Sequence, residues 1–136
     1  MSGEFRQRVR PEWIDYNGHL SEAYYVLVFG FATDAVLDRL GLDAAYRTSA
    51  GCSVYTVEAH VRYLREVGPD AELVVSTLIT GGGAKKLVLC HEMRVDGELV
   101  ATEELLALHV DSAASRSAPF PPEVAERITD WTGPAP

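Results

Sequence analysis

A single carboxylate stands on a glycine-containing turn directly before a long apolar segment. Residues 12–25 read EWIDYNGHLSEAYY, with Asp15 in the turn and Ser21 at the expected start of a helix. The first turn of a helix offers unpaired backbone N–H groups and the positive end of the helix dipole. A carboxylate beside such donors can add water to a polarised carbonyl group. We therefore predict that Asp15 is catalytic; the alternative is a turn aspartate that caps the backbone.

The residues after Asp15 complete this candidate site. Asn17 and Gly18 form a turn dipeptide, and glycine also lets the backbone approach a ligand closely. The backbone amides from Glu22 to Tyr24 would then face the carbonyl oxygen. His19 either holds the turn by hydrogen bonds or touches the substrate, and we favour the structural role.

The bulk properties narrow the function classes. The chain has 136 residues, which fits one domain, and a net charge of -8, which argues against nucleic-acid binding. Residues 1–10 lack the apolar run of a secretory signal, and the apolar run 23–32 is shorter than the ~20 residues that span a bilayer. Cys52 and Cys90 are isolated, with no metal-ligand spacing. We expect a soluble, cytoplasmic protein with reduced cysteines, no membrane contact and no metal.

The elements that must position Asp15 follow an α+β order. The helix is apolar almost all round, which predicts burial on several sides by a curved antiparallel sheet and a second subunit. Residues 112–136 form a Pro-rich C-terminal tail, with one helical turn expected within 122–131. The predicted elements are a strand at 5–10, the helix at 21–40 ending at Gly41, a short helical or irregular segment at 43–50, and strands at 52–65, 71–80, 85–95 and 98–111.

A two-residue turn at Asp96-Gly97 predicts the register of the last hairpin. If Val95 pairs with Glu98, His91 lies opposite Thr102, with Glu104 as a diagonal neighbour on the same apolar face. Polar groups on such a face need partners. His91 and Glu104 therefore either form a buried pair, which we favour, or line the substrate pocket.

With these motifs, the chain resembles the hot-dog-fold acyl-CoA thioesterases of the 4-hydroxybenzoyl-CoA thioesterase type. Within that superfamily it looks closest to the betainyl-CoA thioesterase group, which is related to a domain fused to some carnitine dehydrogenases. The likeness covers essentially the whole chain. It rests on the segments 15–19 (DYNGH) with Glu22 and the following Tyr24 or Tyr25, 61–64 (VRYL), 101–104 (ATEE), 108–111 (LHVD) and 119–122 (PFPP).

The resemblance implies a single hot-dog domain over 1–136, with a sheet wrapped around the long helix. It implies hydrolysis of a short or polar acyl-CoA thioester to a free acid and CoA, with the cationic betainyl group as one candidate acyl group. Asp15 would act there as general base or as nucleophile. The active site would lie between subunits of a homodimer or homotetramer, and no cofactor is expected beyond the coenzyme A of the substrate.

Further site residues follow from this resemblance, each beside a structural alternative. Glu22 would recognise a cationic acyl group, with aromatic faces from Trp13, Tyr24, Tyr25 or Tyr55; otherwise Glu22 favours the helix dipole and the aromatic side chains are packing. The amide of Ala23 would contribute to substrate binding. Arg65, Lys85 and Lys86 would meet the phosphates of coenzyme A, unless the lysines belong to a solvated, flexible hairpin.

Two competing functions remain at this level. A hot-dog hydratase or dehydratase needs a paired histidine and carboxylate acting on the acyl chain, and the expected motif around such a histidine is missing. A non-catalytic acyl-CoA-sensing module would keep the pocket without needing Asp15.

Overall fold

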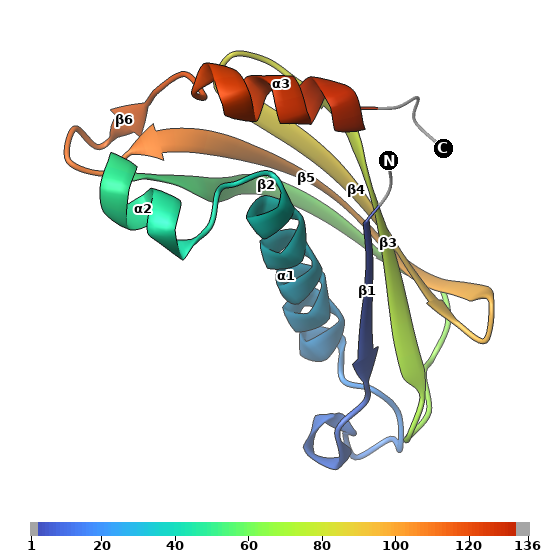
Figure 1. Cartoon of the computed structure of the whole chain (residues 1–136). Coiled ribbons are helices and arrows are strands. Elements are labelled where there is room, and N and C mark those ends of the chain that lie inside the picture. The colour runs from blue at the N-terminus through green and yellow to red at the C-terminus, as the bar shows by residue number, and fades with distance from the viewer. Residues whose placement is uncertain (1–2, 133–136) are drawn as a thin grey trace.

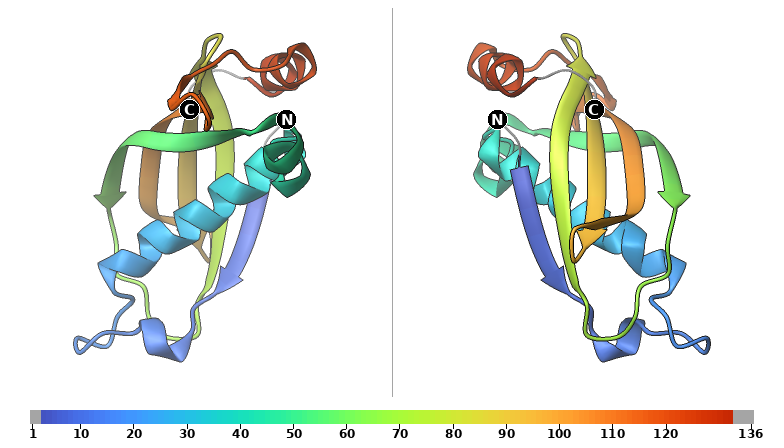
Figure 2. Two further views of the ribbon diagram at one scale, coloured as in Figure 1. Left: turned by 90° about the vertical axis from the view of Figure 1, so that its left-hand side faces the viewer. Right: turned by 90° about the vertical axis from the view of Figure 1, so that its right-hand side faces the viewer.

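The computed structural model describes residues 3–132, in which a curved antiparallel sheet encloses one long helix (Figure 1). The strand order is β1-β3-β4-β5-β2, and β6 pairs with the end of β5. Figure 2 shows α1 crossing one face of the sheet between the outer strands β1 and β2. The elements are β1 (Gly3–Arg8), a 3-10 turn η1 (Pro11–Trp13), α1 (Glu22–Arg39), α2 (Ala44–Ala50), β2 (Cys52–Tyr63), β3 (Glu72–Gly82), β4 (Lys86–Val95), β5 (Glu98–Asp111), β6 (Arg116–Ser117) and α3 (Pro122–Trp131).

The central helix begins and ends where the sequence predicts. Ser21 is the N-cap residue, and Gly41 adopts a positive φ of 85° just after the C-cap Leu40. One side of α1 is buried against the sheet, but Val26 and Leu27 on the other side remain 42% and 40% exposed. Within this single chain, the predicted burial on several sides is therefore incomplete.

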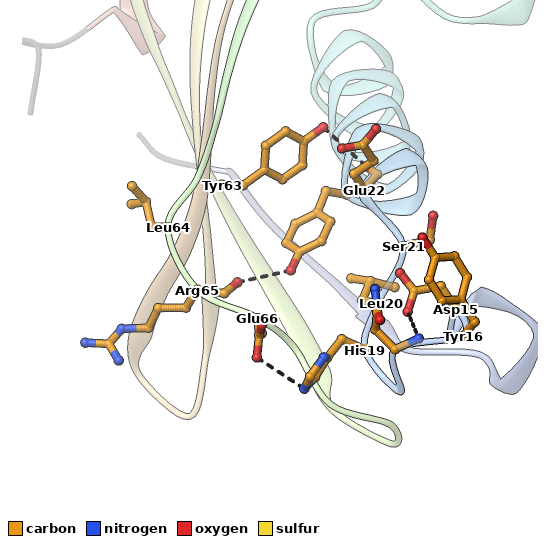
Figure 3. Close-up of a pocket in the computed structure, with 12 residues that line it drawn as sticks. Asp15, Tyr16, His19, Leu20, Ser21, Glu22, Tyr63, Leu64, Arg65 and Glu66 are labelled. Carbon is orange, nitrogen blue, oxygen red and sulfur yellow. Dashed lines mark hydrogen bonds and ion pairs between the residues drawn. The ribbon is translucent and has the colours of Figure 1, made fainter.

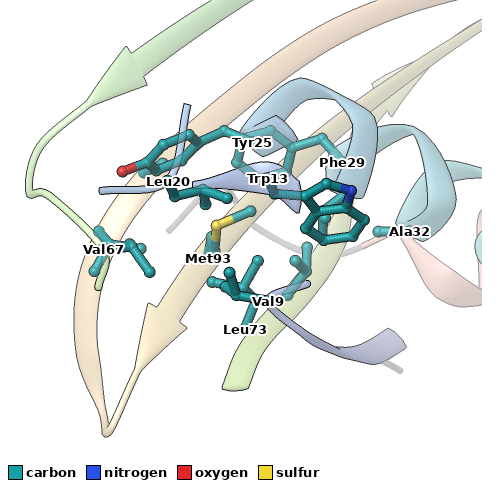
Figure 4. Close-up of a cluster of buried hydrophobic side chains, with 13 residues drawn as sticks. Val9, Trp13, Leu20, Tyr25, Phe29, Ala32, Val67, Leu73 and Met93 are labelled. Atoms are coloured by element: carbon teal, nitrogen blue, oxygen red, sulfur yellow. The ribbon is translucent and has the colours of Figure 1, made fainter. Parts of the chain in front are cut away.

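Two apolar clusters hold the helix against the sheet. The first joins Phe29 of α1 to Trp13, Leu73 and Met93, and Figure 4 shows these side chains packed together. The second lies at the C-terminal end of α1 and includes Leu40 together with residues of α3. The tail is thus more ordered than we predicted: α3 is a ten-residue helix rather than one turn, because Val124, Ile128 and Trp131 all face the core.

A β-bulge in β5 overturns the predicted register around His91. Val95 pairs with Glu98 as predicted, but Val100 is an extra residue, since Arg94 pairs with Leu99 and Met93 with Ala101. His91 therefore lies opposite Glu103, not Thr102. Because side chains alternate along a strand, Glu103 is buried and Glu104 is exposed on the opposite face.

The two edges of the sheet differ in character. β1 is a six-residue strand with charged side chains such as Arg6 and Arg8, which discourage further strand pairing. β2 is twelve residues long and exposes Tyr55 and Val57, each 49% accessible. Among residues 3–132, no helix is long and apolar enough to cross a bilayer.

Candidate active site

Asp15 lies on a tight turn that hydrogen bonds of its own backbone and side chain hold. The Asp15 amide donates to His19 O at 2.9 Å, and the Gly18 amide donates to Asp15 O at 3.0 Å. The Asp15 side chain accepts the Asn17 amide through Oδ1 at 2.8 Å. Gly18 has a φ of 80°, a conformation that a side chain would strain. The turn therefore fixes the half-buried Asp15 carboxylate and leaves Oδ2 free of turn contacts.

The start of α1 follows this turn directly. The Ser21 amide donates to Trp13 O, and the Tyr24 amide donates to Ser21 O, both at 3.0 Å. Within the described residues, the amides of Glu22 and Ala23 have no hydrogen-bond acceptor, as expected for the first positions of a helix. Such amides can stabilise negative charge on a thioester oxygen.

A groove of about 910 Å³ joins the turn, the start of α1 and the segment after β2. Figure 3 shows how the walls are tied together. The Tyr63 hydroxyl donates to Glu22 O at 3.3 Å, and the Tyr25 hydroxyl donates to Arg65 O at 3.1 Å. The pKa of Tyr25 is raised chiefly by burial, so its phenol stays protonated. The groove residues are Asp15, Tyr16, Asn17, His19, Leu20, Ser21, Glu22, Tyr25, Tyr63, Leu64, Arg65 and Glu66.

His19 faces the far wall of the groove. Its Nε2 atom lies 3.2 Å from Glu66 Oε2, and both side chains remain partly exposed. This contact links the turn to the segment after β2, as the structural role that we favoured for His19 requires.

The predicted aromatic residues divide into packing and groove positions. Trp13 is 5% exposed and stacks on Tyr24, with ring centroids 5.3 Å apart and planes inclined by 13°. This pair supports the base of α1. Tyr25 reaches the groove, and the ring of Tyr63 meets it edge to face at 5.1 Å. Tyr55 lies near the opposite end of β2, paired with Leu108, so one chain does not bring it to Asp15.

The predicted coenzyme A contacts are also dispersed. Arg65 contributes to the groove, but its guanidinium points away from Asp15 in Figure 3 and lies 3.9 Å from Glu98. Lys85 and Lys86 lie at the β3–β4 turn, at the opposite end of the sheet from the Asp15 turn (Figure 1). One chain therefore does not bring the lysines and Asp15 to one site.

Comparison with known proteins gives a family for this arrangement. The family model of the thioesterase-like superfamily matches residues 9–128. The chain belongs to this superfamily. It is 43% identical over 122 residues to a betainyl-CoA thioesterase of Pseudomonas aeruginosa, covering 88% of this chain and 77% of that protein.

Two further relatives extend the comparison. An L-carnitine dehydrogenase/betainyl-CoA thioesterase of Agrobacterium fabrum is 51% identical over 121 residues, which cover 88% of this chain but 25% of that larger protein. A hypothetical protein of Staphylococcus aureus, solved in complex with CoA, superposes with a TM-score of 0.95 at 25% identity, covering 100% of this chain and 87% of that one. The predicted hot-dog fold, family and class of reaction, thioester hydrolysis, are confirmed.

Of the groove's second wall, the sequence interpretation included only Arg65 among the site residues. Tyr63, Leu64 and Glu66 line the same groove as Asp15 only because the sheet curves around α1 and brings the end of β2 beside the helix start. A signal was present, since Tyr63 alternates with Val61, which packs on the core beneath α1.

Proposed function

We propose that this protein is an acyl-CoA thioesterase that hydrolyses betainyl-CoA. Water adds to the carbonyl carbon of the thioester, the carbon–sulfur bond breaks, and betaine and the CoA thiol leave. The observation that carries the proposal is that Asp15 and Glu22 line one groove at the start of α1, where the amides of Glu22 and Ala23 have no acceptor among the described residues. The named relatives support betainyl as the acyl group.

In this proposal, Asp15 supplies the chemical step. Its carboxylate either takes a proton from the attacking water or attacks the carbonyl carbon itself. The amides of Glu22 and Ala23 hold the oxygen on which negative charge develops. Asn17 and Gly18 keep the turn in shape, and His19 anchors it to Glu66.

We further propose that the active form is at least a homodimer and that it acts in the cytoplasm. The long exposed edge of β2, with Tyr55 and Val57, and the open side of α1 at Val26 and Leu27 support association, because exposed strands and apolar patches of this kind mark interfaces. Pairing along β2 would also let Tyr55, Lys85 or Lys86 of a second protomer approach the groove of the first. Cys52 and Cys90 are free thiols, as a reducing compartment requires.

The experiment compares thiol release from betainyl-CoA, acetyl-CoA, butyryl-CoA and benzoyl-CoA by the native protein and by Asp15→Asn. We expect betainyl-CoA to be preferred and the Asp15→Asn variant to lose about 10²- to 10⁴-fold in kcat, the usual contribution of a general base. Asparagine keeps an oxygen for the Asn17 amide, so the fold should persist. Glu12→Gln, at an exposed carboxylate of η1, is the matched control and should retain activity. Full activity in Asp15→Asn would disprove the assigned role.

A further inference from the structure

A second groove lies next to the active-site groove, between α1 and β2. It has a volume of about 480 Å³ and is walled by Val26, Leu27 and Gly30 of α1 and by Ala59 of β2. On α1 it begins at Val26, directly after Tyr25 of the active-site groove; on β2 its lining residue Ala59 lies four residues before Tyr63, which lines the first groove. The two grooves therefore follow one another along the seam between helix and strand.

The charge in this second groove is entirely negative among the described residues that line it. Asp34 and Glu103 contribute carboxylates, and no lysine, arginine or histidine is among the lining residues. Most of the remaining surface is apolar. A groove of this composition disfavours anions and accommodates a cation that needs little hydration.

Glu103 is the unusual member, because its side chain is 7% exposed and forms no hydrogen bond within residues 3–132. The Nε2 atom of His91, the residue opposite it on β4, lies 4.0 Å from Glu103 Oε1, beyond hydrogen-bond distance. Burial raises the pKa of Glu103 to about 7, which reflects the difficulty of charging it without a partner. A carboxylate in this state is open to a cationic ligand.

His91 does not supply the missing positive charge. Thr33 Oγ1 donates to Phe29 O at 3.0 Å, so it must accept the 2.8 Å bond from His91 Nε2–H. His91 Nδ1 then accepts from Thr77 Oγ1 at 2.6 Å. The ring is satisfied as a neutral imidazole, and burial lowers the pKa of His91 to about 4. Near neutral pH, Glu103 therefore has no cationic partner among the described residues around it.

We propose that Glu103 selects the acyl group by placing a carboxylate against the quaternary ammonium of a betainyl substrate. The inference rests on the proposed thioesterase function and assigns its specificity. A trimethylammonium group has no N–H to donate, so an apolar surface with an aromatic face and a nearby negative charge suits it. Tyr63 donates to Glu22 O and lies two residues along β2 from Val61, the strand partner of Glu103, so its ring can supply the aromatic face. Glu22, our predicted cation contact, is exposed at the groove mouth and acts there at most as a secondary charge.

The spacing along the sheet agrees with a short acyl group. Tyr63 pairs with Ala101, and Val61 pairs with Glu103. Glu103 is therefore displaced from Tyr63 by two residues along the strands. Two residues of strand correspond to about 7 Å. A thioester carbonyl at the start of α1, beside Tyr63, would leave a short cationic acyl group pointing toward Glu103.

The test compares betainyl-CoA with its neutral isostere, 3,3-dimethylbutyryl-CoA, in which carbon replaces the quaternary nitrogen. The kcat/KM ratio of the two substrates is measured for the native protein, for Glu103→Gln and for the matched control Glu104→Gln. Glu104 adjoins Glu103 in sequence but is exposed on the other face. We expect the native protein to favour the cation, Glu103→Gln to lower that ratio by about tenfold or more, and Glu104→Gln to preserve it.

A second measurement is independent of turnover of the charged substrate. Tetramethylammonium should inhibit native hydrolysis of the neutral isostere, and Glu103→Gln should lose this inhibition. An unchanged ratio, or equal losses on both substrates, would overturn the role of Glu103 while leaving the thioesterase proposal intact. A native protein that hydrolyses the neutral thioester but does not favour the cation would overturn both the selection and the betainyl assignment. A native protein that hydrolyses none of the thioesters would disprove the proposed function itself.

Discussion

The Tyr63 hydroxyl donates a 3.3 Å hydrogen bond to the backbone carbonyl of Glu22, so the end of β2 is tied to the first residue of α1. This bond spans the active-site groove between its two walls. It therefore connects the curvature of the sheet to the position of the amides that we assign to the oxyanion.

Replacing Tyr63 with phenylalanine should weaken this connection. We expect a loss of about 0.5–1 kcal/mol in the free energy of unfolding, since the bond is partly exposed, and a larger relative loss in kcat than in KM. Urea unfolding and steady-state kinetics measure the two effects. Tyr46→Phe, which removes a 2.7 Å hydrogen bond to His109 Nε2 away from both grooves, is the control; it should lower stability but leave kcat and KM unchanged. Identical behaviour of the two variants would refute the role of the hydroxyl.

Gly18→Ala should strain the turn that carries Asp15. The φ of 80° costs a residue with a Cβ atom roughly 1–2 kcal/mol, although an added Cβ would meet no other atom within 4 Å. We expect activity to fall more than tenfold because the Asp15 carboxylate moves, with thermal unfolding shifted by a few degrees. Gly83→Ala, in an equally open loop position without a positive φ, should be neutral. Retained activity in Gly18→Ala would show that the turn geometry is not needed.

The buried pair of His91 and Glu103 predicts a specific pH dependence of stability. The pKa of Glu103 is raised from 4.5 to about 7, so between these values the folded state holds a proton that the unfolded state has lost. Stability from this group is therefore lost as the pH rises from 4.5 to 7. His91 works in the opposite direction: its pKa is lowered from 6.5 to about 4, so its contribution is gained as the pH rises over that window.

Glu103→Gln should separate these two opposing effects. The free energy of unfolding of the variant minus that of the native protein should grow by on the order of 2–3 kcal/mol from pH 4.5 to 7. The reason is that glutamine has no carboxyl group that must lose its proton while buried. Urea unfolding at several pH values measures this difference. Asp34, the other carboxylate of this groove, is present in both proteins and does not contribute to the difference. Glu104→Gln serves as the control. Parallel stability curves for native protein and Glu103→Gln would contradict the assignment.

The long exposed edge of β2 predicts self-association. Val57 lies at a bulge of this strand and is 49% exposed, so Val57→Lys should place a charge at the edge without disturbing the core. We expect the native protein to sediment as a dimer or larger assembly, and Val57→Lys to sediment as a monomer with reduced activity. Ala125→Lys, on the exposed side of α3, should leave both properties unchanged. A fully active native monomer at micromolar concentration would rule out the shared site.

The sequence predicted those parts of the molecule that depend on neighbouring residues. The Asp15 turn, the Ser21 cap, the Gly41 stop and the Asp96-Gly97 hairpin all depend on local backbone chemistry. The far wall of the groove could not be predicted in this way, because Glu66 meets His19 only after the sheet has closed around α1. The burial of Glu103 was hidden for another reason. Val100 and Ala101 are both small, apolar residues, and nothing in their types reveals which one is extra in the ladder.

The Val100 bulge also supports the catalytic groove through its backbone. Its carbonyl oxygen accepts hydrogen bonds from the amides of Leu64 at 2.9 Å and Arg65 at 3.1 Å, and both of these residues line the groove. These hydrogen bonds involve the backbone of Val100, and its side chain contributes only packing. Another apolar residue could therefore take its place. Removing the residue would leave two amides without their shared acceptor. At this point, the number of residues in the strand matters more to the active site than their identity.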